Sequence, residues 1–139
     1  MNKSQLAGGS SAGREWAWIV LFTLLGAAPR MGGLGGLGID HFDEGIYALA
    51  GTWSLQPGGL RQLDPTLISY APAGYPVLVG LANILVGPSA QSGLLVSILF
   101  GTLTIPMIGW LGRRWMGPGA GAAAAAILAV SGRGIAFSR

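Results

Sequence analysis

The sequence has no cysteine, a single histidine and few charged residues, and each shortage excludes a class of protein. Without cysteine, the 139-residue chain has no disulfide scaffold, no thiolate metal site and no cysteine nucleophile. Its 8 basic and 5 acidic residues make up 9% of the chain, against about 25% in an ordinary soluble domain. Hydrophobic residues make up 51%, so too few charges remain to cover a water-soluble globule. We therefore expect an all-α integral membrane protein.

The net charge of +3 does not indicate a nucleic-acid partner. The basic residues are scattered singly except for Arg113-Arg114, and they form no stripe with interleaved aromatic residues. A phosphate-binding loop requires a glycine-rich stretch that ends in Lys-Ser or Lys-Thr, whereas the only lysine is Lys3. A lone histidine, His41, cannot build a histidine-rich metal site. We therefore predict no nucleic acid, no nucleotide cofactor and no histidine-rich metal site.

Three apolar segments are predicted to span the membrane: residues 16–38, 91–111 and 117–137. About 20 helical residues suffice to cross a hydrocarbon core of roughly 30 Å. The last segment is rich in alanine, and Gly117 and Gly121 have the spacing of residues that allow close helix contact. The shorter apolar run at 73–86 falls short of a full crossing, so it is predicted to be a juxtamembrane helix.

The first span has a competing interpretation as a cleaved signal peptide. Lys3 and Arg14 supply a basic start, and Gly26-Ala27-Ala28 offers small residues for cleavage. However, Pro29 would follow the cut directly, and the apolar run continues past it. An uncleaved span is therefore the favoured interpretation.

Basic residues at the ends of the spans predict the orientation of the chain. Cations mark cytoplasmic ends, and they lie before the first span and, as Arg113-Arg114, after the second. Residues 1–15 are then a cytoplasmic tail, and residues 40–90 are an outer loop that contains the juxtamembrane helix. Arg113 and Arg114 are both interpreted as determinants of this topology.

The most informative polar feature is the acidic cluster at the start of the outer loop. If a helix begins at Asp40, then Asp43, Glu44 and Tyr47 lie on one face with it. In a structural interpretation Asp40 is the N-cap, and the two following acids favour the positive end of the helix dipole. In a functional interpretation, carboxylates grouped at a membrane boundary serve acid–base chemistry or bind a cation. The residues alone leave both interpretations open.

Two arginines lie near the predicted outer ends of spans, Arg30 in the first and Arg139 after the last. Each either faces a phosphate group or extends its charge to the lipid headgroups.

Between the first and second predicted spans, Tyr70, Pro72 and Tyr75 belong to an aromatic and proline-rich entry to the juxtamembrane helix. As a structural turn, this entry needs no function.

Taken in order, the motifs resemble the N-terminal region of the C-superfamily glycosyltransferases. These enzymes take a sugar from a polyprenyl phosphate, and they include protein mannosyltransferases and the aminoarabinose transferases that act on lipid A. The matching residues are Asp43-Glu44 with Tyr47, Tyr70-Ala71-Pro72-Ala73-Gly74-Tyr75-Pro76, Arg113-Arg114-Trp115-Met116-Gly117, and Ser138-Arg139. The chain departs from the family where a doubled proline is reduced to Pro72.

The resemblance implies a role for each matching residue. Asp43 would be the general base and Glu44 would orient the base or the acceptor, while the substrate would be bound by Tyr47, Tyr70, Arg30 and Arg139. The donor would be a polyprenyl-phosphate sugar, the acceptor a protein, a lipid or a cell-envelope glycan, and no nucleotide cofactor would be needed. The site would face outward from a bacterial-type plasma membrane.

Family members have many more spans, so the resemblance implies that residues 16–139 are the N-terminal part of the transmembrane domain of a larger enzyme. By itself the chain is then expected to be inactive. Two alternatives stay open: a small non-enzymatic membrane scaffold or subunit, and a fragment of a transporter whose acidic residues bind a cation.

Overall fold

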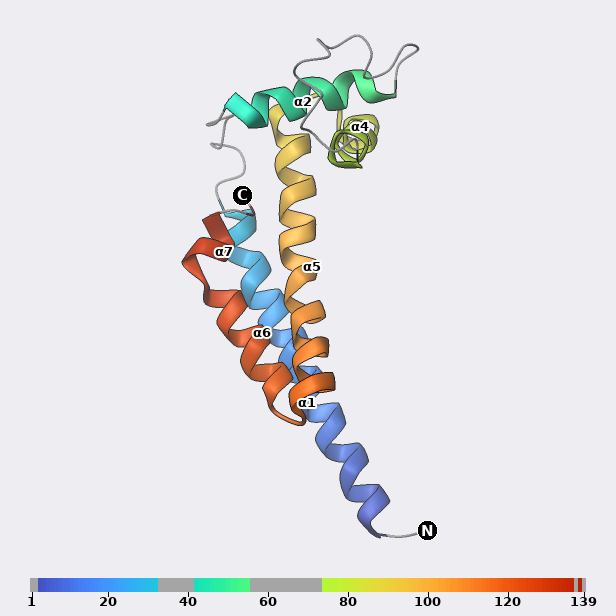
Figure 1. Cartoon of the computed structure of the whole chain (residues 1–139), viewed down its shortest axis with the longest axis vertical. Coiled ribbons are helices and arrows are strands. Elements are labelled where there is room, and N and C mark those ends of the chain that lie inside the picture. The colour runs from blue at the N-terminus through green and yellow to red at the C-terminus, as the bar shows by residue number, and fades with distance from the viewer. Residues whose placement is uncertain (1–2, 33–41, 56–73, 137, 139) are drawn as a thin grey trace. The chain divides into compact units, whose positions relative to one another are not determined.

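The computed structural model describes residues 3–32, 42–55, 74–136 and 138, and within these ranges the chain forms helices and turns without a strand. The predicted all-α class is confirmed for this part of the chain. The helices are α1 (Lys3–Met31), α2 (Phe42–Ser54), α4 (Gly74–Val86), α5 (Ala90–Met116), α6 (Ala120–Val130) and α7 (Gly132–Ala136) (Figure 1). They belong to two compact units, one made of Met1–Gly32 with Ile98–Arg139 and the other of Gly33–Ser97.

Among the described residues, α5 is the one helix long and apolar enough to cross a membrane. Its apolar part, Gln91–Met116, has 26 residues and a length of about 39 Å. The predicted first span coincides with α1 as far as Met31, and its residues 33–38 lie outside the described ranges. The predicted last span is divided into α6, which has 11 residues, and α7. Three spans therefore stay a prediction.

The first unit is a bundle in which α1 lies beside α6 and also contacts α5 (Figure 1). Its core is formed by Ile19 of α1, Ile105 of α5, and Ala125 and Ala129 of α6. Only two of these side chains are large, so the helices approach one another closely. Such packing between small residues relies on van der Waals contact, which is how helices associate in an apolar solvent.

Glycines make the closest helix contacts possible. A Cβ atom on Gly121 would meet the carbonyl oxygen of Gly109 and lie 3.0 Å from the Cβ atom of Arg113. The predicted role of Gly121 in close packing is thus confirmed, whereas Gly117 lies in the turn between α5 and α6. In that turn Gly117 and Gly119 have φ angles of 91° and 88°, a conformation that glycine adopts without steric cost.

We expect Gly121→Ala to lower the free energy of unfolding by about 1–3 kcal/mol, because the added methyl group must displace the backbone of α5. The matched control is Gly13→Ala, where a Cβ atom on the same bundle meets nothing within 4 Å; a helical alanine there is neutral or stabilises by up to about 1 kcal/mol. Thermal unfolding in detergent micelles, followed by circular dichroism, distinguishes the two. Equal stability of both variants would contradict the close packing of α5 and α6.

Large apolar side chains of the first unit point outward rather than into the core. Leu24 is 65% exposed, Met107 67% and Ile127 70%, and each comes from a different helix. The interior is therefore made of alanine, glycine and a few large residues, while the exterior is apolar. Burial from water favours large apolar side chains in the interior, so their exposure on three helices leaves this unit with an apolar surface.

In the second unit, α2 packs against α4. Gly51 and Gly80 bring the two helices together, since Cβ atoms at these positions would overlap Val79 and Ser54 respectively. The hydroxyl group of Ser54 donates to the carbonyl oxygen of Pro76 at 3.2 Å. Helix α4 occupies the segment predicted to be a juxtamembrane helix; its position along a membrane surface stays a prediction.

Candidate functional site

The predicted catalytic pair lies in the first turn of α2. The helix begins at Phe42 rather than at Asp40, so Asp43 and Glu44 are its second and third residues and Tyr47 follows one turn later. The backbone of this turn is helical, whereas the side chains of Asp43 and Glu44, and all of Asp40, lie outside the described part of the structure. Asp43 and Glu44 thus precede Tyr47 by one helical turn, whereas the predicted face shared with Asp40 and the assignment of a general base stay predictions.

Tyr47 makes a specific contact with the first turn of α4. Its ring meets the ring of Tyr75 edge to face, with centroids 5.2 Å apart and an interplanar angle of 78°, a favoured geometry for aromatic pairs. Sequence reasoning placed these tyrosines in two separate motifs, and the structure brings them together. Tyr47 is therefore held in a defined place one turn beyond Asp43.

The hydroxyl group of Tyr75 is anchored to the start of α5. It lies 3.1 Å from the carbonyl oxygen of Gly93, to which it donates, and 2.8 Å from the Oγ atom of Ser97. These bonds fix the ring of Tyr75 against which Tyr47 packs. Tyr70, the other predicted binding residue of this region, lies outside the described residues.

An open cavity of about 290 Å³ lies farther along α2, between α2 and α4. Its polar lining residues, Thr52 and Asn83, are already bonded: Thr52 donates to the carbonyl oxygen of Ala48 at 3.1 Å, and Asn83 accepts a hydrogen bond from Ser92. Among the described residues, none that lines this cavity is charged. It therefore offers no group for acid–base chemistry.

Arg30 is buried among carbonyl and hydroxyl oxygens of the first unit. Its side chain is 1% exposed, and its Nε atom donates to the Oγ atom of Ser138 at 2.9 Å. The two terminal nitrogens donate to the carbonyl oxygens of Gly26, at 2.7 Å, and of Leu128, at 3.5 Å. The structure thus gives Arg30 internal partners that the sequence did not indicate, and no carboxylate pairs with it among the described residues.

Arg30 lies where the last apolar segment is interrupted. Leu128 is in the final turn of α6, whose carbonyl groups lack intrahelical partners, and Ser131 after it adopts an extended conformation. The backbone of Ser138 is held nearby because its hydroxyl group also donates to the carbonyl oxygen of Gly134 at 2.7 Å. Arg139, predicted to contact phosphate, follows Ser138 directly and lies outside the described residues.

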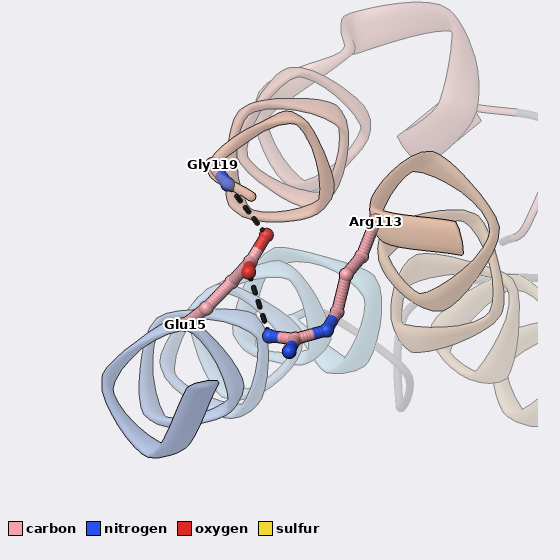
Figure 2. A network of polar contacts seen from close by, with 3 residues as sticks. All are labelled: Glu15, Arg113 and Gly119. Carbon is pink, nitrogen blue, oxygen red and sulfur yellow. Dashed lines mark hydrogen bonds and ion pairs between the residues drawn. The ribbon is translucent and has the colours of Figure 1, made fainter. Parts of the chain in front are cut away.

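At the opposite end of the first unit, Glu15 forms a polar cluster that the sequence analysis missed. Its carboxylate accepts a hydrogen bond from the guanidinium group of Arg113 at 2.7 Å and another from the backbone amide of Gly119 at 2.9 Å (Figure 2). Glu15 is 6% exposed and the Arg113 side chain 29%. One carboxylate therefore joins α1, the end of α5 and the turn before α6.

A signal for this cluster is present in the sequence. Glu15 is the only acidic residue outside residues 40–64, and it stands at the start of an apolar run. An acid in that position is costly unless it is paired. Arg113 stands at the corresponding end of another apolar segment, so the two charges are natural partners once both segments are helices in one bundle.

The described side chains contain no group of three His, Cys, Asp or Glu that is able to hold a metal ion, and the acidic cluster at 40–44 lies outside them. Comparison of the chain with protein-family models, with curated proteins and with solved structures finds no match. The family resemblance of the motifs therefore stays a prediction.

Proposed function

We propose that the chain is the N-terminal portion of a membrane-embedded glycosyltransferase that moves a sugar from a polyprenyl phosphate to an acceptor outside the cytoplasm. The observation that carries the proposal is the contact of Tyr47 with Tyr75. It joins the motif that begins with Asp43-Glu44 to the proline-rich motif. Tyr47 belongs to the first motif and Tyr75 to the second. The order of the motifs and their helical setting support the same interpretation.

Asp43 acts as the general base in this proposal. Its carboxylate accepts the proton of an acceptor hydroxyl or amine while that oxygen or nitrogen attacks the anomeric carbon of the sugar. The bond between the anomeric carbon and the phosphate oxygen breaks, and the polyprenyl phosphate leaves with the electron pair. The attack from the opposite face inverts the anomeric configuration, and Glu44 orients the base or the acceptor.

Positive charge stabilises the departing phosphate. Arg139 is the proposed direct contact, because it follows Ser138 immediately in the sequence. Arg30 already donates to three oxygens of the protein, so its proposed part is to place Ser138 and to add positive charge near it. Tyr47 and Tyr70 are proposed to line the acceptor or sugar site.

The apolar exterior of the first unit supports a membrane location for this chemistry. The α5 helix is long enough to cross the bilayer, and outward-facing residues such as Leu24 and Ile127 suit contact with lipid. We propose that α1, α5 and the α6–α7 pair all cross, with Arg113-Arg114 at the cytoplasmic side. Residues 40–90, which include Asp43, then face outward.

The proposal is tested with the product of the complete natural reading frame. The protein is expressed in cells that lack the natural gene, and membranes are prepared from them. Membranes are incubated with a panel of radiolabelled polyprenyl-phosphate hexoses and pentoses, and release of polyprenyl phosphate is measured together with labelled acceptor. We expect one donor to be consumed above the level of membranes without the gene. If the protein is inserted normally and none of the donors is consumed, the non-enzymatic scaffold becomes the better account.

A further inference from the structure

The first unit gathers its tryptophans at the end where Glu15 meets Arg113. Trp16 and Trp18 flank this end on α1, and Trp110 and Trp115 flank it on α5. The rise of an α-helix places each of them within about 5 Å, along its helix axis, of the paired residue in its own helix. All of these tryptophans are exposed, by 40% to 76% of their surface.

Two of the three arginines at this end carry uncompensated charge. Glu15 neutralises Arg113, whereas Arg14 and Arg114 are exposed and have no ionic partner among the described residues. Glu15 is the only acidic residue on α1, and α5 and α6 have none. The exposed charge at this end is therefore positive.

The aromatic and basic groups are arranged in layers. The ion pair of Glu15 with Arg113 makes α1 and α5 antiparallel, since the core residues follow Glu15 in α1 but precede Arg113 in α5. Trp16, Trp18 and Trp110 accordingly lie on the core side of the ion pair, and Arg14, Arg114 and Trp115 lie on the far side. Indole rings next to an apolar band and cations just beyond them match the order of layers at a membrane interface.

We propose that Arg14 and Arg114, together with Trp16, Trp18, Trp110 and Trp115, form a girdle that binds the headgroups of anionic phospholipids in one leaflet. The guanidinium groups pair with lipid phosphates, for which their planar arrangement of donors is well suited. Arg113 takes no part, because its charge is already paired within the protein. The inference rests on the membrane location proposed above, and it separates two adjacent arginines that the sequence treats alike.

The girdle is tested by quenching of tryptophan fluorescence with brominated lipids. The full chain carries Trp53→Phe, so that only girdle tryptophans emit, and it is reconstituted into vesicles containing brominated phosphatidylglycerol or brominated phosphatidylcholine. An arginine near an anionic surface strengthens binding on the order of fivefold. In the parent protein we therefore expect binding of phosphatidylglycerol to be several-fold stronger than binding of phosphatidylcholine. In Arg14→Gln/Arg114→Gln we expect the ratio of the two to fall to about one.

The matched control is Arg133→Gln, which removes an exposed arginine in α7 and is expected to leave the preference unchanged. Equal quenching by the two lipids in the parent protein, a preference that survives the double substitution, or an equal loss in Arg133→Gln would each overturn the girdle. Extraction of the protein from membranes by alkaline carbonate is measured first. A protein that alkaline carbonate extracts contradicts the membrane location itself, whereas an embedded protein without lipid preference contradicts the girdle alone.

Discussion

Asp43→Asn is expected to abolish glycosyl transfer by the complete gene product while leaving its amount in the membrane unchanged. The amide has nearly the same shape as the carboxylate, but it cannot take the proton of the attacking acceptor. Loss of a general base typically lowers the rate by a factor of about 10² to 10⁴. The measurement is the initial rate of polyprenyl phosphate release, normalised to the protein detected in the same membranes.

Asp64→Asn is the matched control for this prediction. Asp64 is an acidic residue of the same predicted outer loop but belongs to none of the family-like motifs, so its substitution is expected to leave the rate near that of the parent. Glu44→Gln is expected to have an intermediate effect, because Glu44 positions the base or the acceptor. If Asp43→Asn keeps the full rate, Asp43 is not the general base.

Glu15→Ala is expected to lower the free energy of unfolding of the first unit by about 3 kcal/mol, as is typical when one partner of a buried ion pair is removed. Two groups lose their partner at once: the guanidinium group of Arg113 and the backbone amide of Gly119. Because Arg113 keeps 29% of its surface exposed, the cost lies at the lower end of the range for fully buried pairs. Reversible unfolding in mixed micelles with increasing sodium dodecyl sulfate gives the value.

A double-mutant cycle separates the ion pair from other losses at the same site. The cycle consists of Glu15→Leu, Arg113→Met and Glu15→Leu/Arg113→Met. The double variant replaces both charges with apolar groups and is expected to recover much of the stability lost in either single variant, since removing both partners leaves no unpaired charge. Arg14→Ala, next to Glu15 but exposed, is expected to change stability by no more than about 0.5 kcal/mol. If Glu15→Ala and the parent unfold at the same fraction of sodium dodecyl sulfate, the carboxylate is solvated and does not stabilise this end of the bundle.

The helical elements were the part of the fold that sequence patterns predicted best. Helix α4 lies at Gly74–Val86, where Pro72 and Gly87-Pro88 bound an apolar run, and such local signals depend only on neighbouring residues. The break after Val130 was not predicted. The signal for it is Ser131-Gly132-Arg133-Gly134, which interrupts the apolar run directly after Val130. The extended conformation of Ser131 is stabilised by its hydroxyl group, which accepts a hydrogen bond from the amide of Gly134 at 3.2 Å.

The partners of the charged residues depend on contacts between distant segments. Glu15 meets Arg113, and Arg30 meets Ser138, only because α1 lies beside α5 and the α6–α7 pair. No local pattern specifies which charge faces which, so the sequence analysis assigned Arg113 to topology and Arg30 to phosphate or lipid. The helix that carries Asp43, Glu44 and Tyr47 was accessible from the sequence because it depends only on local pattern, and the grouping of their side chains stays a prediction.

The account depends most on the orientation of the chain, with the acidic cluster outside and Arg113-Arg114 inside. The sequence has no cysteine, so a single cysteine substitution is the only site on the chain that a maleimide labels. Gln62→Cys, in the predicted outer loop, and Pro118→Cys, in the turn between α5 and α6, are treated with a membrane-impermeant maleimide in intact cells. We predict labelling of Gln62→Cys at once and of Pro118→Cys only after permeabilisation. Labelling of Pro118→Cys in intact cells, with Gln62→Cys protected, would place Asp43 on the wrong side for the proposed reaction and contradict the account.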